Sequence, residues 1–232
     1  KLFLTQTLIH NPTGGNTSPA KGFKILSLAQ KYDFHIVEDD IFGSLCARQT
    51  LRLSSLDEWN RTFYISGFSK VLSPALRLGY VVAPAKFVEG LIEQKMYNLL
   101  CGSSLDETIV TYTLESGRYR HHLDGLRQRV TQERVRAREW LGNKGVVFDD
   151  ASAQGVFLWA RFPQHVDLRR LIERAHDARI FLAPGSLFSN THDYDQYIRL
   201  NVSHCNDIRF KHFIDAQLDC ETELTGKTEQ DA

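Results

Sequence analysis

The sequence predicts an α/β protein with a mostly parallel sheet in its larger part and a small α+β layer in its smaller part. Strand-like and helix-like segments alternate through the first hundred residues, and such alternation is typical of parallel sheets. A long amphipathic segment follows at 119–141 and is ended by Gly142-Asn143-Lys144-Gly145, a composition typical of a turn. We therefore expect two domains joined by one long helix.

Hydrophobic periodicity and turn residues define the expected elements in chain order. In the first part we expect strands at 2–8, 34–38, 62–66 and 79–83, and helices at 19–32, 85–100, 106–116 and 119–141. In the second part we expect strands at 146–148, 156–162, 180–183 and 198–202, and helices at 168–178 and 207–219. The long helix carries many basic residues between 118 and 138, interleaved with leucine and valine, which is typical of a helix with one solvated face.

Composition excludes several classes of function. The 232 residues are 42% hydrophobic and 24% charged, which is enough for a substantial core. Lys plus Arg and Asp plus Glu number 28 each, so net charge does not favour nucleic acid or an anionic membrane as a partner. The four cysteines are widely spaced, unlike a disulfide scaffold or a zinc site. With no long apolar run and no signal-peptide profile, we expect a cytoplasmic protein without a metal site.

The most informative motif is Ser66-Gly67-Phe68-Ser69-Lys70, with Arg77 seven residues after the lysine. The preceding β-branched and aromatic run predicts that Lys70 follows the carboxyl end of a strand, where open α/β sheets bind ligands. A partly desolvated lysine there loses its proton more easily and attacks carbonyl carbon. Ser66, Ser69 and Arg77 supply hydrogen-bond donors and positive charge for a phosphate. A reactive lysine beside a phosphate site suggests pyridoxal 5'-phosphate.

Two other segments strengthen this interpretation. In His10-Asn11-Pro12-Thr13-Gly14-Gly15, the proline and glycines predict a turn after the first strand, so that Asn11 projects an amide from the strand end. In the second segment, an apolar strand runs into Glu38-Asp39-Asp40 before Phe42 and Gly43. Acids at this end of a strand can face a cationic nitrogen of a ligand. An alternative, a Mg²⁺ site at Asp39 and Asp40, lacks the glycine-rich phosphate loop that would accompany it.

Together these three segments resemble the fold-type I pyridoxal-phosphate enzymes of the class I/II aminotransferase family, and the resemblance covers nearly the whole chain. It implies that Lys70 is the Schiff-base lysine, that Asn11 bonds the phenolic oxygen of the cofactor, and that Asp39 pairs with the pyridine nitrogen. It also implies that Arg77 holds the phosphate with Ser66 or Ser69.

Later in the chain, Tyr197-Ile198-Arg199-Leu200-Asn201 resembles the family segment whose arginine binds the substrate α-carboxylate. The resemblance thus implies Arg199, with Asn11, as substrate-binding residues. It implies that 1–117 is the C-terminal part of a cofactor-binding large domain, 118–142 an interdomain helix and 143–220 a small domain. From its polar composition we expect 221–232 to be a disordered tail. The resemblance further implies a homodimer, and we expect that the first part of the large domain precedes Lys1.

Three positions depart from the family pattern. Gly67 stands where the family has Ser or Thr three residues before the lysine, so one phosphate hydroxyl is replaced or lost. Phe42 stands where a tyrosine hydroxyl shares the cofactor's phenolic oxygen with the asparagine, which predicts altered or weaker turnover. Ala75 replaces a common glycine, a minor change.

Gly117-Arg118-Tyr119-Arg120-His121-His122, with the segments above, is also similar to MocR-type regulators, in which an aminotransferase-like domain follows a GntR-type winged helix, and to the aminoadipate and aromatic aminotransferases. Three functions follow. The first is an aminotransferase that moves an amino group between an amino acid and a 2-oxo acid through Lys70. The second is a pyridoxal-phosphate-binding effector domain with little turnover, which meets DNA only through an upstream winged helix. The third is a degenerate α/β domain without cofactor.

Overall fold

The computed structural model describes residues 1–46, 50–150 and 152–228, with side chains of the last helix as far as Leu218. The chain divides into two compact units. The first comprises Lys1–His10 and Gly15–Gln128, and the second comprises Asn11–Gly14 and Arg129–Ala232. The turn that contains Asn11 therefore belongs to the second unit, although it lies close to the start of the chain.

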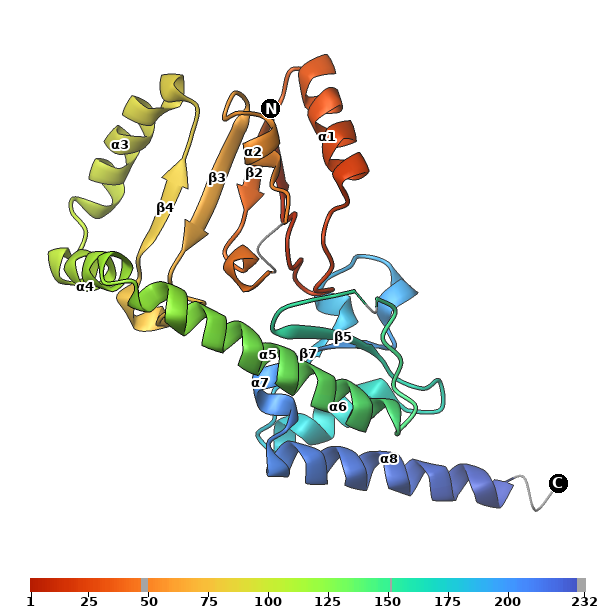
Figure 1. Cartoon of the computed structure of the whole chain (residues 1–232). Helices are drawn as coiled ribbons and strands as arrows, with labels where there is room; N and C mark the ends of the chain where they lie inside the picture. Colours follow the sequence, from red (N-terminus) through yellow and green to blue (C-terminus); the bar gives the residue numbers. More distant parts are fainter. Residues whose placement is uncertain (47–49, 151, 229–232) are drawn as a thin grey trace. The chain divides into compact units, whose positions relative to one another are not determined.

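A four-stranded sheet forms the centre of the first unit (Figure 1). Its strands lie in the order β1 (Leu2–Thr5), β2 (His35–Asp39), β3 (Thr62–Gly67) and β4 (Gly79–Val82). The first three are parallel, and β4 pairs antiparallel with β3. The prediction of a mostly parallel sheet is confirmed.

Helices of the first unit begin where the sequence offers capping residues. Helix α1 (Pro19–Lys31) starts with proline after Ser18, whose hydroxyl accepts a hydrogen bond from the Lys21 amide. Ser103 caps α4 in the same way. The other helices are α2 (Leu53–Leu56), α3 (Ala85–Leu99), α4 (Ser104–Glu115) and the long α5 (Arg118–Gly142), whose last part lies in the second unit.

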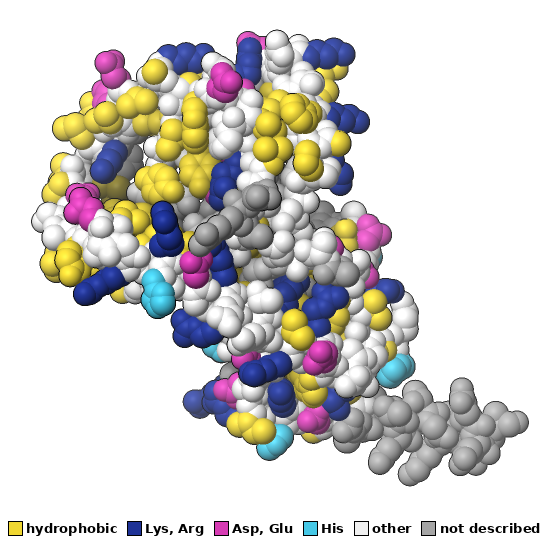
Figure 2. Space-filling view, viewed as in Figure 1, with side chains coloured by type: hydrophobic (Ala, Val, Ile, Leu, Met, Phe, Trp, Pro, Cys, Tyr) yellow, Lys and Arg dark blue, Asp and Glu magenta, His cyan; other side chains and the backbone are white. Residues whose placement is uncertain are grey.

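The first unit exposes much apolar surface, and Figure 2 shows hydrophobic side chains gathered over it. Leu2 and Leu4 on β1 are about 70% exposed, and Val81 on β4 is half exposed. A small buried cluster of Ala29, Ile36 and Leu53 joins α1, β2 and α2. Both edge strands of the sheet therefore present apolar side chains outward.

The second unit contains an antiparallel sheet in the order β5 (Phe157–Arg161), β7 (Tyr197–Asn201) and β6 (Ala183–Pro184). Helices α6 (Leu168–Asp177), α7 (Val202–Cys205) and α8 (Ile208–Thr228) accompany it. Its core includes Leu141 of α5, Leu158 of β5, Ile198 of β7 and Ile214 of α8, all fully buried. This is the small α+β layer that the sequence predicts.

Three expectations differ from the structure. The strand expected at 180–183 is reduced to the two residues of β6, because only Ala183 and Pro184 pair with β7. The expected strand at 146–148 is reduced to one bridge between Val147 and Arg161. Just beyond it, Asp150 Oδ1 accepts hydrogen bonds from the Ser152 amide and hydroxyl, a pattern typical of a turn. Helix α8 runs to Thr228 and so enters the segment expected to be a disordered tail, since a polar composition does not exclude a helix. Residues 229–232 lie outside the described part. Among the described residues, no helix is long and apolar enough to cross a membrane.

Candidate cofactor and substrate site

The carboxyl ends of β2 and β3 bring several predicted cofactor residues of the first unit to one edge of the sheet. Asp39 is the last residue of β2 and pairs in register with Ile65 of β3. The next amide, that of Asp40, donates to the Ile65 carbonyl oxygen at 2.8 Å. Lys70 lies in the turn that follows β3. This is the edge at which the sequence places the ligand.

Two donors orient the carboxylate of Asp39. Gln6 Nε2 donates to Oδ2 at 3.0 Å, and the Ile41 amide donates to Oδ1 at 3.1 Å. A carboxylate held in this way can form a charge-assisted pair with a protonated ring nitrogen. Gln6 was not predicted as a site residue, although its position directly after β1 and at the same sheet edge is a signal that could have identified it.

The environment of Lys70 differs from the expectation in one respect. Its side chain is exposed, so the first unit as described does not supply the predicted desolvation. The Val71 and Leu72 amides both donate to the Phe68 carbonyl oxygen, which forms the turn that carries the lysine. Lys70 Nζ lies 5.9 Å from the ring centroid of Phe42, whose side chain is 5% exposed. The residue that replaces the family's tyrosine is therefore a buried neighbour of the lysine.

The candidate phosphate ligands are not equivalent. Ser66 is buried, and its hydroxyl donates to the Asp40 carbonyl oxygen at 3.2 Å. Ser69 is half-buried, and Arg77 is exposed in a left-handed conformation with φ of 43° after a 3-10 turn at Pro74–Leu76. Ser69 and Arg77 are thus better candidates than Ser66. At Gly67, a Cβ would lie only 3.1 Å from the Leu78 carbonyl oxygen, which gives a steric reason for the glycine.

The two acids that flank Asp39 have structural partners. Glu38 is fully buried and accepts hydrogen bonds from the Thr7 hydroxyl and from the Leu53 and Ser54 amides at the start of α2. Because side chains alternate along a strand, Glu38 and Asp40 point to one face and Asp39 to the other.

One carboxylate oxygen of Asp40 has protein donors as partners. Its Oδ2 accepts from Arg52 Nε at 2.7 Å and from the Tyr64 hydroxyl at 2.5 Å. Burial raises the pKa of the Asp40 carboxyl, and the bonds from Tyr64 and Arg52 oppose that change. Among the described residues, no group of three or more His, Cys, Asp or Glu side chains is placed to hold a metal ion.

Both predicted substrate residues lie in the second unit, and they touch. Arg199 Nη1 donates to Asn11 Oδ1 at 2.9 Å. The guanidinium carbon of Arg199 lies 4.5 Å from the ring centroid of Phe157 and 5.1 Å from that of Phe188, and partial burial lowers its pKa. A guanidinium fixed between two rings and an amide keeps further N–H donors for a carboxylate. Phe157 and Phe188 were not predicted as site residues.

The turn after Asn11 packs closely on the segment that leads into β5. Gly14 adopts φ of 71°, and a Cβ there would lie 2.8 Å from the Gln154 carbonyl oxygen and 3.2 Å from that of Phe157. The Gln154 amide donates to the Gly14 carbonyl oxygen at 2.8 Å. A glycine is therefore required by both conformation and space.

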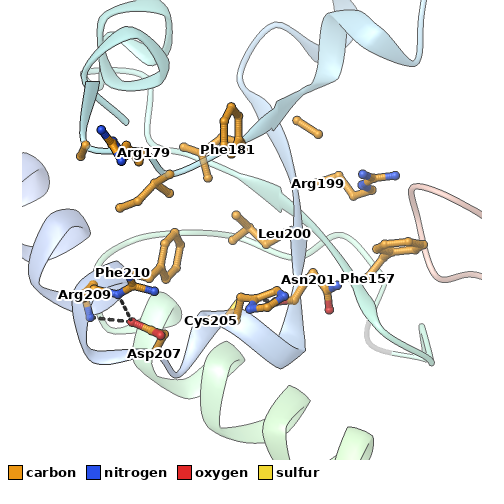
Figure 3. Close-up of a pocket in the computed structure, with 15 residues that line it drawn as sticks. Phe157, Arg179, Phe181, Arg199, Leu200, Asn201, Cys205, Asp207, Arg209 and Phe210 are labelled. Carbon is orange, nitrogen blue, oxygen red and sulfur yellow. Dashed lines mark hydrogen bonds and ion pairs between the residues drawn. The ribbon is translucent and has the colours of Figure 1, made fainter. Parts of the chain in front are cut away.

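A pocket of about 440 Å³ lies beside β7 (Figure 3). Phe181, Leu200 and Phe210 give it an apolar lining. Figure 3 shows Arg199 next to Phe157 at one side of this pocket, while Asp207 and Arg209 form an ion pair at the other. The pocket thus combines an apolar lining with three arginines, Arg179, Arg199 and Arg209.

Comparison with known proteins agrees with the geometry. The family model described as "Aminotransferase class I and II" matches residues 1–216. An aromatic-amino-acid aminotransferase of Thermococcus litoralis is 28% identical over 209 residues, which are 88% of this chain and 50% of that protein. An uncharacterized HTH-type transcriptional regulator of Bacillus subtilis, YdfD, is also 28% identical, over 88% of this chain and 43% of that protein. The chain thus spans about half the length of the curated relatives it matches.

Solved structures show the same fold. A kynurenine aminotransferase of Pyrococcus horikoshii, in complex with PMP, superposes with a TM-score of 0.83 at 25% identity, over 97% of this chain and 57% of that one. A multiple substrate aminotransferase of Thermococcus profundus gives a TM-score of 0.81 at 24% identity, over 96% and 57% of the two chains. The fold is therefore that of the fold-type I aminotransferases.

Proposed function

Because this chain belongs to the class I and II aminotransferase family, we propose that it is the catalytic part of a pyridoxal 5'-phosphate-dependent aminotransferase. The protein would transfer an amino group between an amino acid and a 2-oxo acid. One observation carries the proposal. Lys70 and Asp39 lie at the same edge of a mostly parallel sheet, where open α/β sheets bind their ligands. The Asp39 carboxylate accepts two hydrogen bonds there, one at each oxygen.

The side chains present fit pyridoxal 5'-phosphate. Asp39 supplies a carboxylate for the ring nitrogen, and Ser69 and Arg77 supply donors for the phosphate. Phe42 gives the site an apolar wall beside Lys70. When bound, the cofactor supplies an electron sink for bonds at the substrate Cα. The PMP in the P. horikoshii structure supports the same choice.

In this proposal Lys70 Nζ takes the proton from the substrate Cα as general base and returns a proton as general acid. Arg199 binds the α-carboxylate with a planar fork of N–H donors, and this contact fixes the orientation of the bond that is broken. Asn11 holds Arg199 through its Oδ1. Its predicted bond to the phenolic oxygen of the cofactor also remains part of the proposal.

We also propose the family's arrangement for the whole protein. Residues 1–117 would belong to the cofactor-binding domain, 118–142 to the interdomain helix and 143–220 to the small domain. A cytoplasmic homodimer is part of the proposal. The exposed apolar side chains on β1 and β4 support this arrangement, because they are available to pack against other parts of the protein or a second subunit.

A second candidate is a cofactor-binding effector domain of a GntR-type regulator, with little or no turnover. Phe42 favours it, because phenylalanine has no hydroxyl to form the hydrogen bond that the family's tyrosine makes to the phenolic oxygen of the cofactor. YdfD and the HTH-type regulator NorG of Staphylococcus aureus, which is 27% identical over 91% of this chain, point the same way. Contact with DNA would require a winged helix elsewhere in the protein.

Visible absorption of the full-length protein distinguishes these candidates. Pyridoxal 5'-phosphate is added first, followed by single amino acids from a panel. A visible band that is lost in Lys70→Ala and converted by one amino acid supports the aminotransferase and identifies its donor. A Lys70-dependent band that no amino acid converts supports the effector domain. The absence of any band would overturn both and leave an α/β domain without cofactor.

A further inference from the structure

Arg134 of α5 is a buried cation in the second unit, with only 7% of its surface exposed. Its Nη1 donates to the carbonyl oxygens of Gly155, at 3.2 Å, and of Phe157, in a short contact. Burial lowers the pKa of this guanidinium to about 10. A charged group is costly to bury unless hydrogen bonds compensate. The two carbonyl oxygens that bind Arg134 supply this compensation.

The segment that Arg134 holds is the one that contacts the substrate residues. Phe157 places its ring 4.5 Å from the Arg199 guanidinium carbon. The backbone N–H of Gln154 donates to the Gly14 carbonyl oxygen at 2.8 Å, and Gly14 also packs against the backbone of Phe157. The segment 154–157 therefore touches Arg199 on one side and the turn that carries Asn11 on the other.

Backbone geometry explains why an arginine suits this place. The carbonyls of Gly155 and Phe157 face Arg134, while the intervening Val156 carbonyl accepts from the Val202 amide at 2.9 Å. Gly155 has φ of 75°, which turns the chain as it enters β5. Successive carbonyls are thus held from opposite sides, and the planar guanidinium gives the fixed donor geometry that an ammonium lacks.

We propose that Arg134 is a positioning residue for substrate binding. It fixes the backbone of 155–157 so that Phe157 and the Asn11 turn hold Arg199 in the orientation that receives a carboxylate. The inference rests on the proposed role of Arg199 in carboxylate binding. It assigns to Arg134 no contact with substrate or cofactor.

The test compares Arg134→Met with Arg138→Met in the full-length protein loaded with pyridoxal 5'-phosphate. Arg138 lies one turn further along α5 and also donates to a carbonyl, that of Asp150, at 3.1 Å, so it is a matched control. Small misplacements of binding groups cost on the order of tenfold to a hundredfold. We expect Arg134→Met to keep the visible cofactor band and to raise KM for the amino acid about tenfold, with a smaller change in kcat. Arg138→Met should leave KM unchanged.

Two further readouts separate positioning from simple loss of stability. Calorimetric binding of a 2-oxo acid to the cofactor-free protein should weaken in Arg134→Met and not in Arg138→Met. Arg134→Lys keeps the charge and most of the stem, so it should fold and show an intermediate loss of affinity. If Arg134→Met does not fold, Arg134→Lys decides the question.

Unchanged KM and 2-oxo acid affinity in a folded Arg134 variant would overturn the inference, as would an equal loss in Arg138→Met. These results differ from a failure of the proposed function. In that case the unmodified protein itself would give no cofactor band and bind no 2-oxo acid.

Discussion

Arg199 Nη1 and Asn11 Oδ1 are 2.9 Å apart, although 188 positions separate the two residues in the sequence. Asn11 is part of the second unit, and its turn packs on the segment 153–157 through Gly14. The segment predicted to bind the cofactor thus also contacts the arginine predicted to bind the substrate.

The Asn11–Arg199 contact predicts a rise in KM of different size for two substitutions that differ in charge. Asn11→Ala removes one acceptor, so Arg199 is less well held and KM for the amino acid should rise about tenfold. Asn11→Asp places a carboxylate where it neutralises the guanidinium and competes with the substrate carboxylate, so KM should rise further. Steady-state kinetics on the loaded protein provide the measurement. A lower KM in Asn11→Asp than in Asn11→Ala would contradict the assigned role of Arg199.

The bond from Gln6 to Asp39 predicts a loss of cofactor affinity in Gln6→Leu. A hydrogen bond to a charged group contributes about 1.5–3 kcal/mol, so the dissociation constant of pyridoxal 5'-phosphate should rise at least about tenfold. Titration followed by visible absorption gives this constant. Gln30→Leu, on the exposed face of α1, serves as control. Equal affinity in both variants would show that Gln6 does not orient Asp39 for the cofactor.

The buried carboxylate of Glu38 predicts a stability defect in Glu38→Gln. Glu38 Oε1 accepts from Thr7 and Leu53, and Oε2 accepts from the Ser54 amide. An amide nitrogen at either position would face an N–H or O–H donor, which costs about 1–3 kcal/mol. We expect the midpoint of urea unfolding, monitored by circular dichroism, to be lower in Glu38→Gln than in the unmodified protein. Glu115→Gln, exposed on α4, should leave the midpoint unchanged, and a similar midpoint for Glu38→Gln would refute the prediction.

We expect the Tyr197 hydroxyl to stabilise the folded state at neutral pH and to lose this effect at alkaline pH. Burial and a hydrogen bond to Asp149 raise its pKa from 10.0 to about 12. The folded state therefore favours the protonated phenol, so the contribution is complete below pH 10 and is lost as the pH rises towards 12. Tyr197→Phe keeps the ring, which stacks on Trp159.

At neutral pH, Tyr197→Phe should lower the free energy of unfolding by about 1 kcal/mol. The difference from the unmodified protein should shrink between pH 10 and 12. Tyr32→Phe, at an exposed position, is the control for general alkaline effects. A difference that stays constant across this range would show that the fold does not perturb the Tyr197 hydroxyl.

The sequence alone was sufficient for the order and type of most of the longer elements, but not for the short helices α2 and α7. Capping serines, glycine turns and hydrophobic periodicity are local signals, and α1, β2, β3 and α5 begin and end within a few residues of the expected limits. The strand expected at 146–148 forms only one bridge, to Arg161, because strand pairing depends on a partner that is distant in sequence. The motif around Lys70 and the acid Asp39 were also readable, since both follow apolar strands directly.

Only the tertiary structure decided which side chains hold the others. Glu38 and Asp40 could not be told from Asp39 by composition, and the Thr7, Arg52 and Tyr64 side chains that bind them come from other elements. Gln6 meets Asp39 across a strand pair, and Arg134 meets Phe157 across a helix and a strand. Such contacts arise from the packing of segments that are distant in sequence. Local periodicity therefore determines most elements and the position of the predicted site residues, whereas packing determines which side chains contact them.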